Sequence, residues 1–169
     1  MSYENNSYEC DCPDFDPEKN TSFEEIYSLF LNSIQDYSIK NLFVYDTEIA
    51  QEMTETFLLR AIPKFRNCEK DLKNINLQCK FFNVKLDLEE EVILSDLMVL
   101  SWMDRVVNDI VQMNLNLNDN DFKHYSEEKN LREKSMYADR IREKVSQEMT
   151  NYGLYRTPFS QWAAGNYGI

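Results

Sequence analysis

Glycine and histidine are scarce in this sequence of 169 residues. Its three glycines, at positions 153, 165 and 168, all lie near the C-terminus. Phosphate-binding loops and dinucleotide folds need several glycines where the backbone approaches a phosphate, so both classes are excluded. The one histidine, His124, lies in a charged stretch and is more typical of a solvated helix start than of a general base.

Basic residues are also in short supply, with 18 Lys and Arg against 30 Asp and Glu and a formal net charge of −12. Binding to duplex DNA depends on neutralising phosphates, so this balance argues against a general nucleic-acid binder. The acids are concentrated in two stretches. Residues 1–30 carry eight acidic and one basic residue, and residues 87–121 carry nine and one. Such acidic faces can orient copies of a protein or a basic partner, or simply keep the protein soluble.

No basic head followed by an apolar run opens the chain, so no secretory signal is expected. The longest apolar stretch, 92–113, has 14 apolar residues in 22 but contains three aspartates and an arginine, which argues against a membrane span. We therefore expect Cys10, Cys12, Cys68 and Cys79 to be free thiols in a reducing compartment. Their spacing lacks the usual zinc-binding pairs, so neither a metal nor a cofactor is expected.

The hydrophobic pattern predicts a mainly α-helical protein, a small bundle with a long central helix, a long C-terminal helix and an extended C-terminal arm. Ser22 and Glu25 have capping-box spacing before a helix over 23–33. A second helix follows Asp46 and runs to about Ala61, with Ile49, Met53, Phe57 and Leu58 facing inward.

The stretch 37–45 is apolar but irregular, and 77–86 alternates weakly like a short strand. The central helix is expected over 88–115, with Leu97, Leu100, Val107 and Ile110 in the core. Three glutamates, 89–91, follow Asp87 at its start, where they favour the positive end of the helix dipole. They point in different directions and so do not form a catalytic pair.

A last amphipathic helix is predicted over about 126–152, ended by Gly153 as its C′ residue. This divides the chain into an acidic arm over 1–20, a helical domain over 21–153 and an aromatic arm over 154–169. The aromatic arm has one charged side chain, Arg156. Exposed aromatic surface is unfavourable in water, so we expect the arm to dock on its own bundle or on another chain. Its candidate contact residues are Tyr155, Phe159, Trp162, Tyr167 and Ile169.

The segments LLRAIPKFRNCEKDL (58–72), FFNVKLDLEEEVILSDLMVLSWMDR (81–105) and WAAGNYGI (162–169) resemble head-tail connector, or adaptor, proteins of tailed bacteriophages. The similarity covers about residues 23–169. It rests on the general residue pattern and on the order of the predicted elements, with no invariant motif. It implies a structural virion protein of the neck, made in the host cytoplasm and without catalytic residues. The resemblance further implies a ring, usually of twelve copies, between the portal protein and a second neck or tail-completion protein, with DNA passing through unbound.

Charged residues of the last helix, Arg132, Arg140 and Arg142, are then candidates for contacts between copies. Two other functions stay open at this point. The chain could be another tail-completion or baseplate component, or a soluble acidic regulator that binds a basic partner through residues 1–30. Oligomeric state separates the regulator from the adaptor, because only the adaptor needs to form rings.

Overall fold

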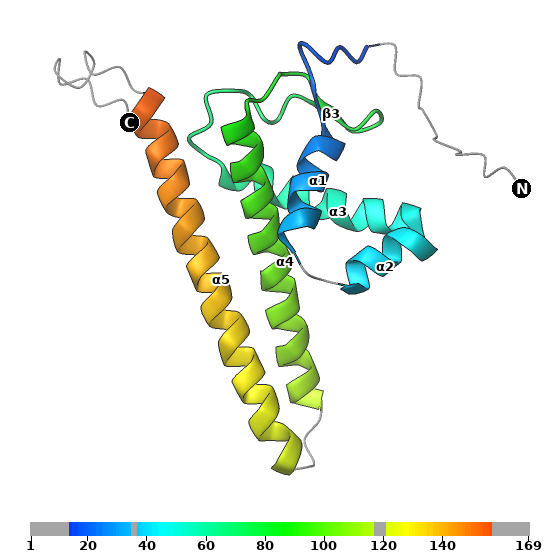
Figure 1. Ribbon diagram of the computed structural model, residues 1–169, viewed down its shortest axis with the longest axis vertical. Helices are drawn as coiled ribbons and strands as arrows, with labels where there is room; N and C mark the ends of the chain where they lie inside the picture. The colour runs from blue at the N-terminus through cyan, green and yellow to red at the C-terminus, as the bar shows by residue number, and fades with distance from the viewer. Residues whose placement is uncertain (1–13, 35–36, 117–120, 157–169) are drawn as a thin grey trace, which may run out of the picture.

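The computed structural model describes residues 14–34, 37–116 and 121–156. It is mainly α-helical, as the sequence predicts, and its two longest helices run antiparallel along the molecule (Figure 1). The elements in chain order are β1 (Thr21–Ser22), α1 (Phe23–Ser33), α2 (Tyr37–Tyr45), α3 (Thr47–Ala61), the 3-10 turn η1 (Ile62–Lys64), β2 (Ile75–Asn76), β3 (Phe81–Phe82), α4 (Leu88–Asn116) and α5 (Asp121–Arg156).

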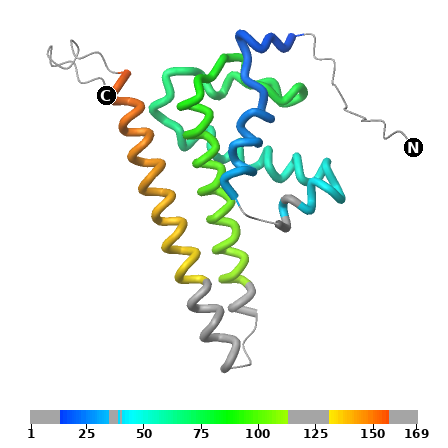
Figure 2. Tube along the Cα trace, in the orientation of Figure 1, coloured from blue at the N-terminus to red at the C-terminus, as the bar shows by residue number. Residues whose placement is uncertain are grey.

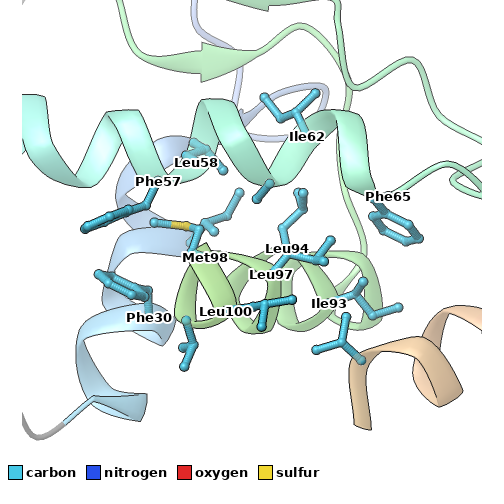
Figure 3. Close-up of a cluster of buried hydrophobic side chains, with 14 of the residues drawn as sticks. Phe30, Phe57, Leu58, Ile62, Phe65, Ile93, Leu94, Leu97, Met98 and Leu100 are labelled. Carbon is cyan, nitrogen blue, oxygen red and sulfur yellow. The ribbon is translucent and has the colours of Figure 1, made fainter. Parts of the chain in front are cut away.

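Helix α4 is the centre of the fold. Helices α1 and α3 pack on one side of it, and α5 runs along the other (Figures 1 and 2). The core is built mostly on the first half of α4, where Leu97 is 2% and Leu100 is 7% exposed. Figure 3 shows Met98 of α4 beside Phe30 of α1 and Phe57 of α3, with Leu94 and Leu97 further along the same helix. The central helix of the prediction is therefore confirmed.

Helix α1 begins and ends where the sequence predicts. The Ser22 hydroxyl accepts a hydrogen bond from the Glu24 backbone N–H at 3.2 Å, which caps the first turn. Glu25, the other half of the predicted capping box, forms an ion pair with Lys85 at 3.5 Å. Helix α3 is capped in the same way by Asp46, which accepts from the Ile49 backbone N–H.

Four sequence expectations on helices and core need correction. The irregular stretch 37–45 is helical, as α2. Ile49 is 53% exposed, because it lies near the start of α3, where an open surface hollow separates this helix from Asp104 and Arg105 of α4. Val107 and Ile110 are only half-buried, since the fully buried positions of α4 end at Met103. Gly153 does not end the last helix, because α5 continues to Arg156.

A small antiparallel sheet closes the end of the core near the start of α4, with β3 between β1 and β2 and Phe82 opposite Thr21 and Ile75. Only Phe81 and Phe82 of the predicted strand 77–86 are paired in it as β3. Before β1, Asn20 donates a hydrogen bond to the Phe82 carbonyl, and the Phe15 ring packs edge-on to Phe81 with 5.4 Å between centroids. Phe15 and Asn20, which the prediction places in the acidic arm over 1–20, therefore contact the helical domain, and residues 1–13 lie outside the described residues.

Candidate functional site

The first turn of α4 is capped by a reciprocal pair of hydrogen bonds. The Glu90 backbone N–H donates to the Asp87 carboxylate at 3.0 Å, and the Asp87 backbone N–H donates to Glu90 Oε2 at 2.9 Å. This is a capping box built from two acids. It fixes the Glu90 side chain inward, where it is fully buried.

Two further donors satisfy the buried Glu90 carboxylate. The Tyr152 hydroxyl of α5 donates to Oε1 at 2.6 Å, and Lys70 Nζ, from the segment between η1 and β2, lies 2.6 Å from Oε2. Arg156 adds an ionic contact at 3.7 Å. A buried charge is tolerated only when it is paired and hydrogen-bonded, and Glu90 meets both conditions.

Tyr152 connects this carboxylate to the end of α5. Its ring packs edge-on to Phe65 with centroids 5.1 Å apart, and the Arg156 guanidinium lies 4.1 Å over its face in a cation–π contact. Its oxygen also accepts from the Glu69 backbone N–H at 3.3 Å. Burial, and then the hydrogen bond to Glu90, raise the pKa of Tyr152 above its ordinary value, so the hydroxyl stays a donor at neutral pH.

Arg156, the last residue of α5, joins the cluster from the outside. Its guanidinium lies 2.5 Å from Asp87 and 3.6 Å from both Glu69 and Glu89. Its hydrogen bond to Asp87 raises the pKa of Arg156 above its already high ordinary value. We call Cys68, Lys70, Asp87, Glu90, Tyr152 and Arg156 the anchor cluster.

The anchor cluster explains why Gly153 does not end the helix. A glycine inside a helix costs about 0.5–1 kcal/mol relative to alanine. Tyr152 and Arg156, one turn apart, make a buried hydrogen bond, a cation–π contact and ion pairs only if the helix continues between them. These contacts outweigh the cost of the glycine. The segment that begins at residue 157 is therefore attached to a firmly held helix end.

The predicted contact residues of the aromatic arm lie on both sides of Arg156, where α5 ends. Tyr155 belongs to α5 and is 85% exposed. Phe159, Trp162, Tyr167 and Ile169 lie outside the described residues. Leu154, Tyr155 and Arg156, which the sequence assigns to an extended arm, are helical.

The three arginines proposed for contacts between copies differ in their surroundings. Arg142 pairs within its own chain, with Asp139 at 2.5 Å and with Asp104 of α4 at 3.3 Å. Arg132 and Arg140 are exposed and form no ion pair within the described part of the chain. Arg132 and Arg140 are therefore better candidates for contacts between copies. Arg142 would first have to break its ion pairs with Asp104 and Asp139.

The two cysteines among the described residues, Cys68 and Cys79, differ in state. Cys68 is a free thiol, half-buried in the anchor cluster, and burial raises its pKa. Cys79 is disulfide-bonded, so the expectation of free thiols is wrong for it. Cys10 and Cys12 lie outside the described residues. Over the ranges the structure describes, no three His, Cys, Asp or Glu side chains group as metal ligands, and no helix is long and apolar enough to span a membrane.

No protein-family model matches the chain, and comparison with curated proteins and with solved structures gives no significant match.

The sequence contains two signals for the anchor cluster that are not used in the predictions above. Asp87 and Glu90 have the spacing of a capping box, and Tyr152 and Arg156 have the i, i+4 spacing of a helical pair. The sequence prediction gives Glu89, Glu90 and Glu91 a capping, dipole-complementing role at the helix start, without a specific partner for Glu90. What could not be foreseen is that Lys70 and Tyr152, far apart in sequence, meet on the same carboxylate.

Proposed function

We propose that this chain is a structural protein of a tailed bacteriophage virion, a head-tail adaptor that forms a ring beneath the portal. The observation that carries the proposal is the anchor cluster at the end of α5. It holds the helix from which residues 157–169 continue, and these contain Phe159, Trp162, Tyr167 and Ile169 but no Asp, Glu, Lys or Arg.

Such an arrangement suits a protein whose task is attachment. A rigid helix end reduces the entropy lost when the segment beyond it binds, because its starting point and direction are already set. Large aromatic side chains supply most of the binding energy in many interfaces. The segment 157–169 is thus suited to bind the portal or a neighbouring copy.

The remaining support is the resemblance of residues 58–72, 81–105 and 162–169 to adaptor proteins, together with the charge of the chain. A net charge of −12 suits a channel for DNA, since an acidic wall does not retain a polyanion. The proposed partners are the portal protein and a second neck or tail-completion protein, with the adaptor in a ring of twelve copies by analogy with that family.

Electron microscopy of the full-length protein mixed with the portal protein of the same gene cluster tests the proposal. An adaptor should add a ring of density to the end of the portal that faces the tail. A tail-completion or baseplate component should assemble with tail proteins and leave the portal bare. A monomer that binds neither, but binds a basic protein, would identify an acidic regulator and refute the proposal.

A further inference from the structure

An apolar groove lies on the side of α4 away from α5. Residues of α2, α3 and α4 line it, with Met53 and Phe57 on α3 and Trp102 and Val106 on α4. Its volume is about 360 Å³. This is near the lower end of the range of about 300–1,000 Å³ for small-ligand sites, so the groove can take one or two aromatic side chains rather than a helix.

We propose that this groove binds residues 157–169 of a second copy of the chain. The inference rests on the proposed function, for which it supplies the contact between neighbouring copies. The segment has the right chemistry, because it contains Phe159, Trp162, Tyr167 and Ile169 and no side chain that is charged at neutral pH. Its docking would bury aromatic surface without burying an unpaired charge.

The other terminal segment suits the groove less well. Residues 1–13 contain three acidic residues and no basic one. At the groove, Arg105 already pairs with Asp109 at 3.8 Å. An acidic segment would therefore lose hydration without gaining a free cation from this pair.

The positions of the groove and of the end of α5 favour a neighbouring copy. Helix α5 packs on one side of α4, whereas α3 packs on the other (Figure 1). The segment thus starts on the face opposite to the groove of its own chain. A donor on one face and an acceptor on the opposite face make a head-to-tail contact, the kind that closes into rings.

The length of the segment is sufficient for this contact. Thirteen extended residues reach about 43–47 Å. Arg156 contacts Asp87 at the start of α4, and Trp102 lies 15 residues further along that helix, or about 22 Å. The segment is therefore about twice as long as this distance along the helix axis, and the remaining length is available to cross to a neighbouring copy.

Site-specific photocrosslinking tests this inference. The full-length chain, with p-benzoylphenylalanine in place of Phe159, is prepared in unlabelled and in ¹⁵N-labelled form. The two are mixed and irradiated, both as free protein and bound to the portal. Mass spectrometry should find crosslinks to the peptides that contain Met53 or Trp102, and these should be of mixed isotope. Crosslinks within one copy, to another surface, to the portal alone, or none at all would overturn the inference.

A charge placed in the groove provides a second test. Val106→Asp should lower the yield of the mixed-isotope crosslink about tenfold or more, because docking would then bury an unpaired carboxylate. Val44→Asp is the matched control, since Val44 is 77% exposed on α2 and does not line the groove. Its yield should equal that of the unsubstituted chain. Circular dichroism verifies that both variants are folded, and equal yields from two folded variants would count against the groove.

The two proposals can fail separately. If the mixed-isotope crosslink forms in free protein that does not bind the portal, the groove contact stands and the adaptor function fails. If the protein forms a ring on the portal and the crosslink maps elsewhere, the adaptor function stands and the groove contact fails.

Discussion

Removal of one buried oxygen tests the anchor cluster most sharply. Tyr152→Phe keeps the ring against Phe65 and Arg156 but removes the hydroxyl that donates to Glu90 at 2.6 Å. A hydrogen bond to a charged group contributes about 1.5–3 kcal/mol, and here the carboxylate left behind is fully buried. We expect the free energy of unfolding to fall by about that amount.

Urea titration followed by circular dichroism measures this change. In a chain of this size, each kcal/mol corresponds to a shift of about 2–4 °C in Tm, so the melting temperature should fall by about 3–12 °C. Tyr155→Phe is the matched control, because Tyr155 lies on the same helix and is 85% exposed. It should change stability by less than about 0.5 kcal/mol. Equal effects of the two substitutions would refute the role assigned to the buried hydroxyl.

Three further substitutions test the fold. Leu100→Ala should cost about 2–5 kcal/mol in urea titrations, since Leu100 is 7% exposed in the core; a loss below 1 kcal/mol would contradict its placement. Gly153→Ala should stabilise the protein by about 0.5–1 kcal/mol, because the position is helical and an added Cβ would lie 3.7 Å from the Asn67 side chain; a destabilised variant would show that Gly153 ends the helix after all. Burial, followed by the charge of Asp96, raises the pKa of Glu148 above its ordinary value of 4.5. The folded chain therefore holds the proton of Glu148 more tightly than the unfolded chain does. This residue thus makes the free energy of unfolding fall as the pH rises above 4.5. Glu148→Gln should lessen that fall in urea titrations between pH 4.5 and neutral pH, and an unchanged slope would contradict the assignment.

Local signals predicted most of the helices. Ser22 and Asp46 cap their helices as expected, and the apolar run after Asp87 gives the central helix. Each of these features depends on residues close in sequence, which is why it could be predicted. The same holds for the last helix, which is amphipathic as predicted, with Ala138, Ile141 and Val145 on its buried face.

Long-range contacts account for what the sequence did not predict. Gly153 is a good helix terminator by local rules, but the contacts of Tyr152 and Arg156 with the start of α4 extend the helix past it. The predicted strand over 77–86 is also wrong in its length, because the strands with which it pairs are short. Its pattern covers ten residues, yet Lys80 has a positive φ of 55° and pairing is confined to Phe81 and Phe82. The anchor cluster itself joins three segments, a combination that no local pattern contains.

The boundary at Arg156 determines how the terminal segment should be removed. A deletion of 154–169 takes Arg156 with it, and so removes the cation–π contact and the ion pair with Asp87. It should lower stability for reasons unrelated to docking. A deletion of 157–169 leaves the anchor cluster complete, and the free energy of unfolding should stay within about 0.5 kcal/mol of that of the full chain.

Binding of the 157–169 deletion to the portal tests the central claim most directly. Full-length and truncated proteins, both shown to be folded by circular dichroism, are mixed with the portal, and electron micrographs are scored for the ring of added density. The account predicts a ring with the full-length chain and none with the truncated chain. A ring of normal occupancy with the truncated chain would contradict it, because attachment would then not depend on the segment that the anchor cluster holds.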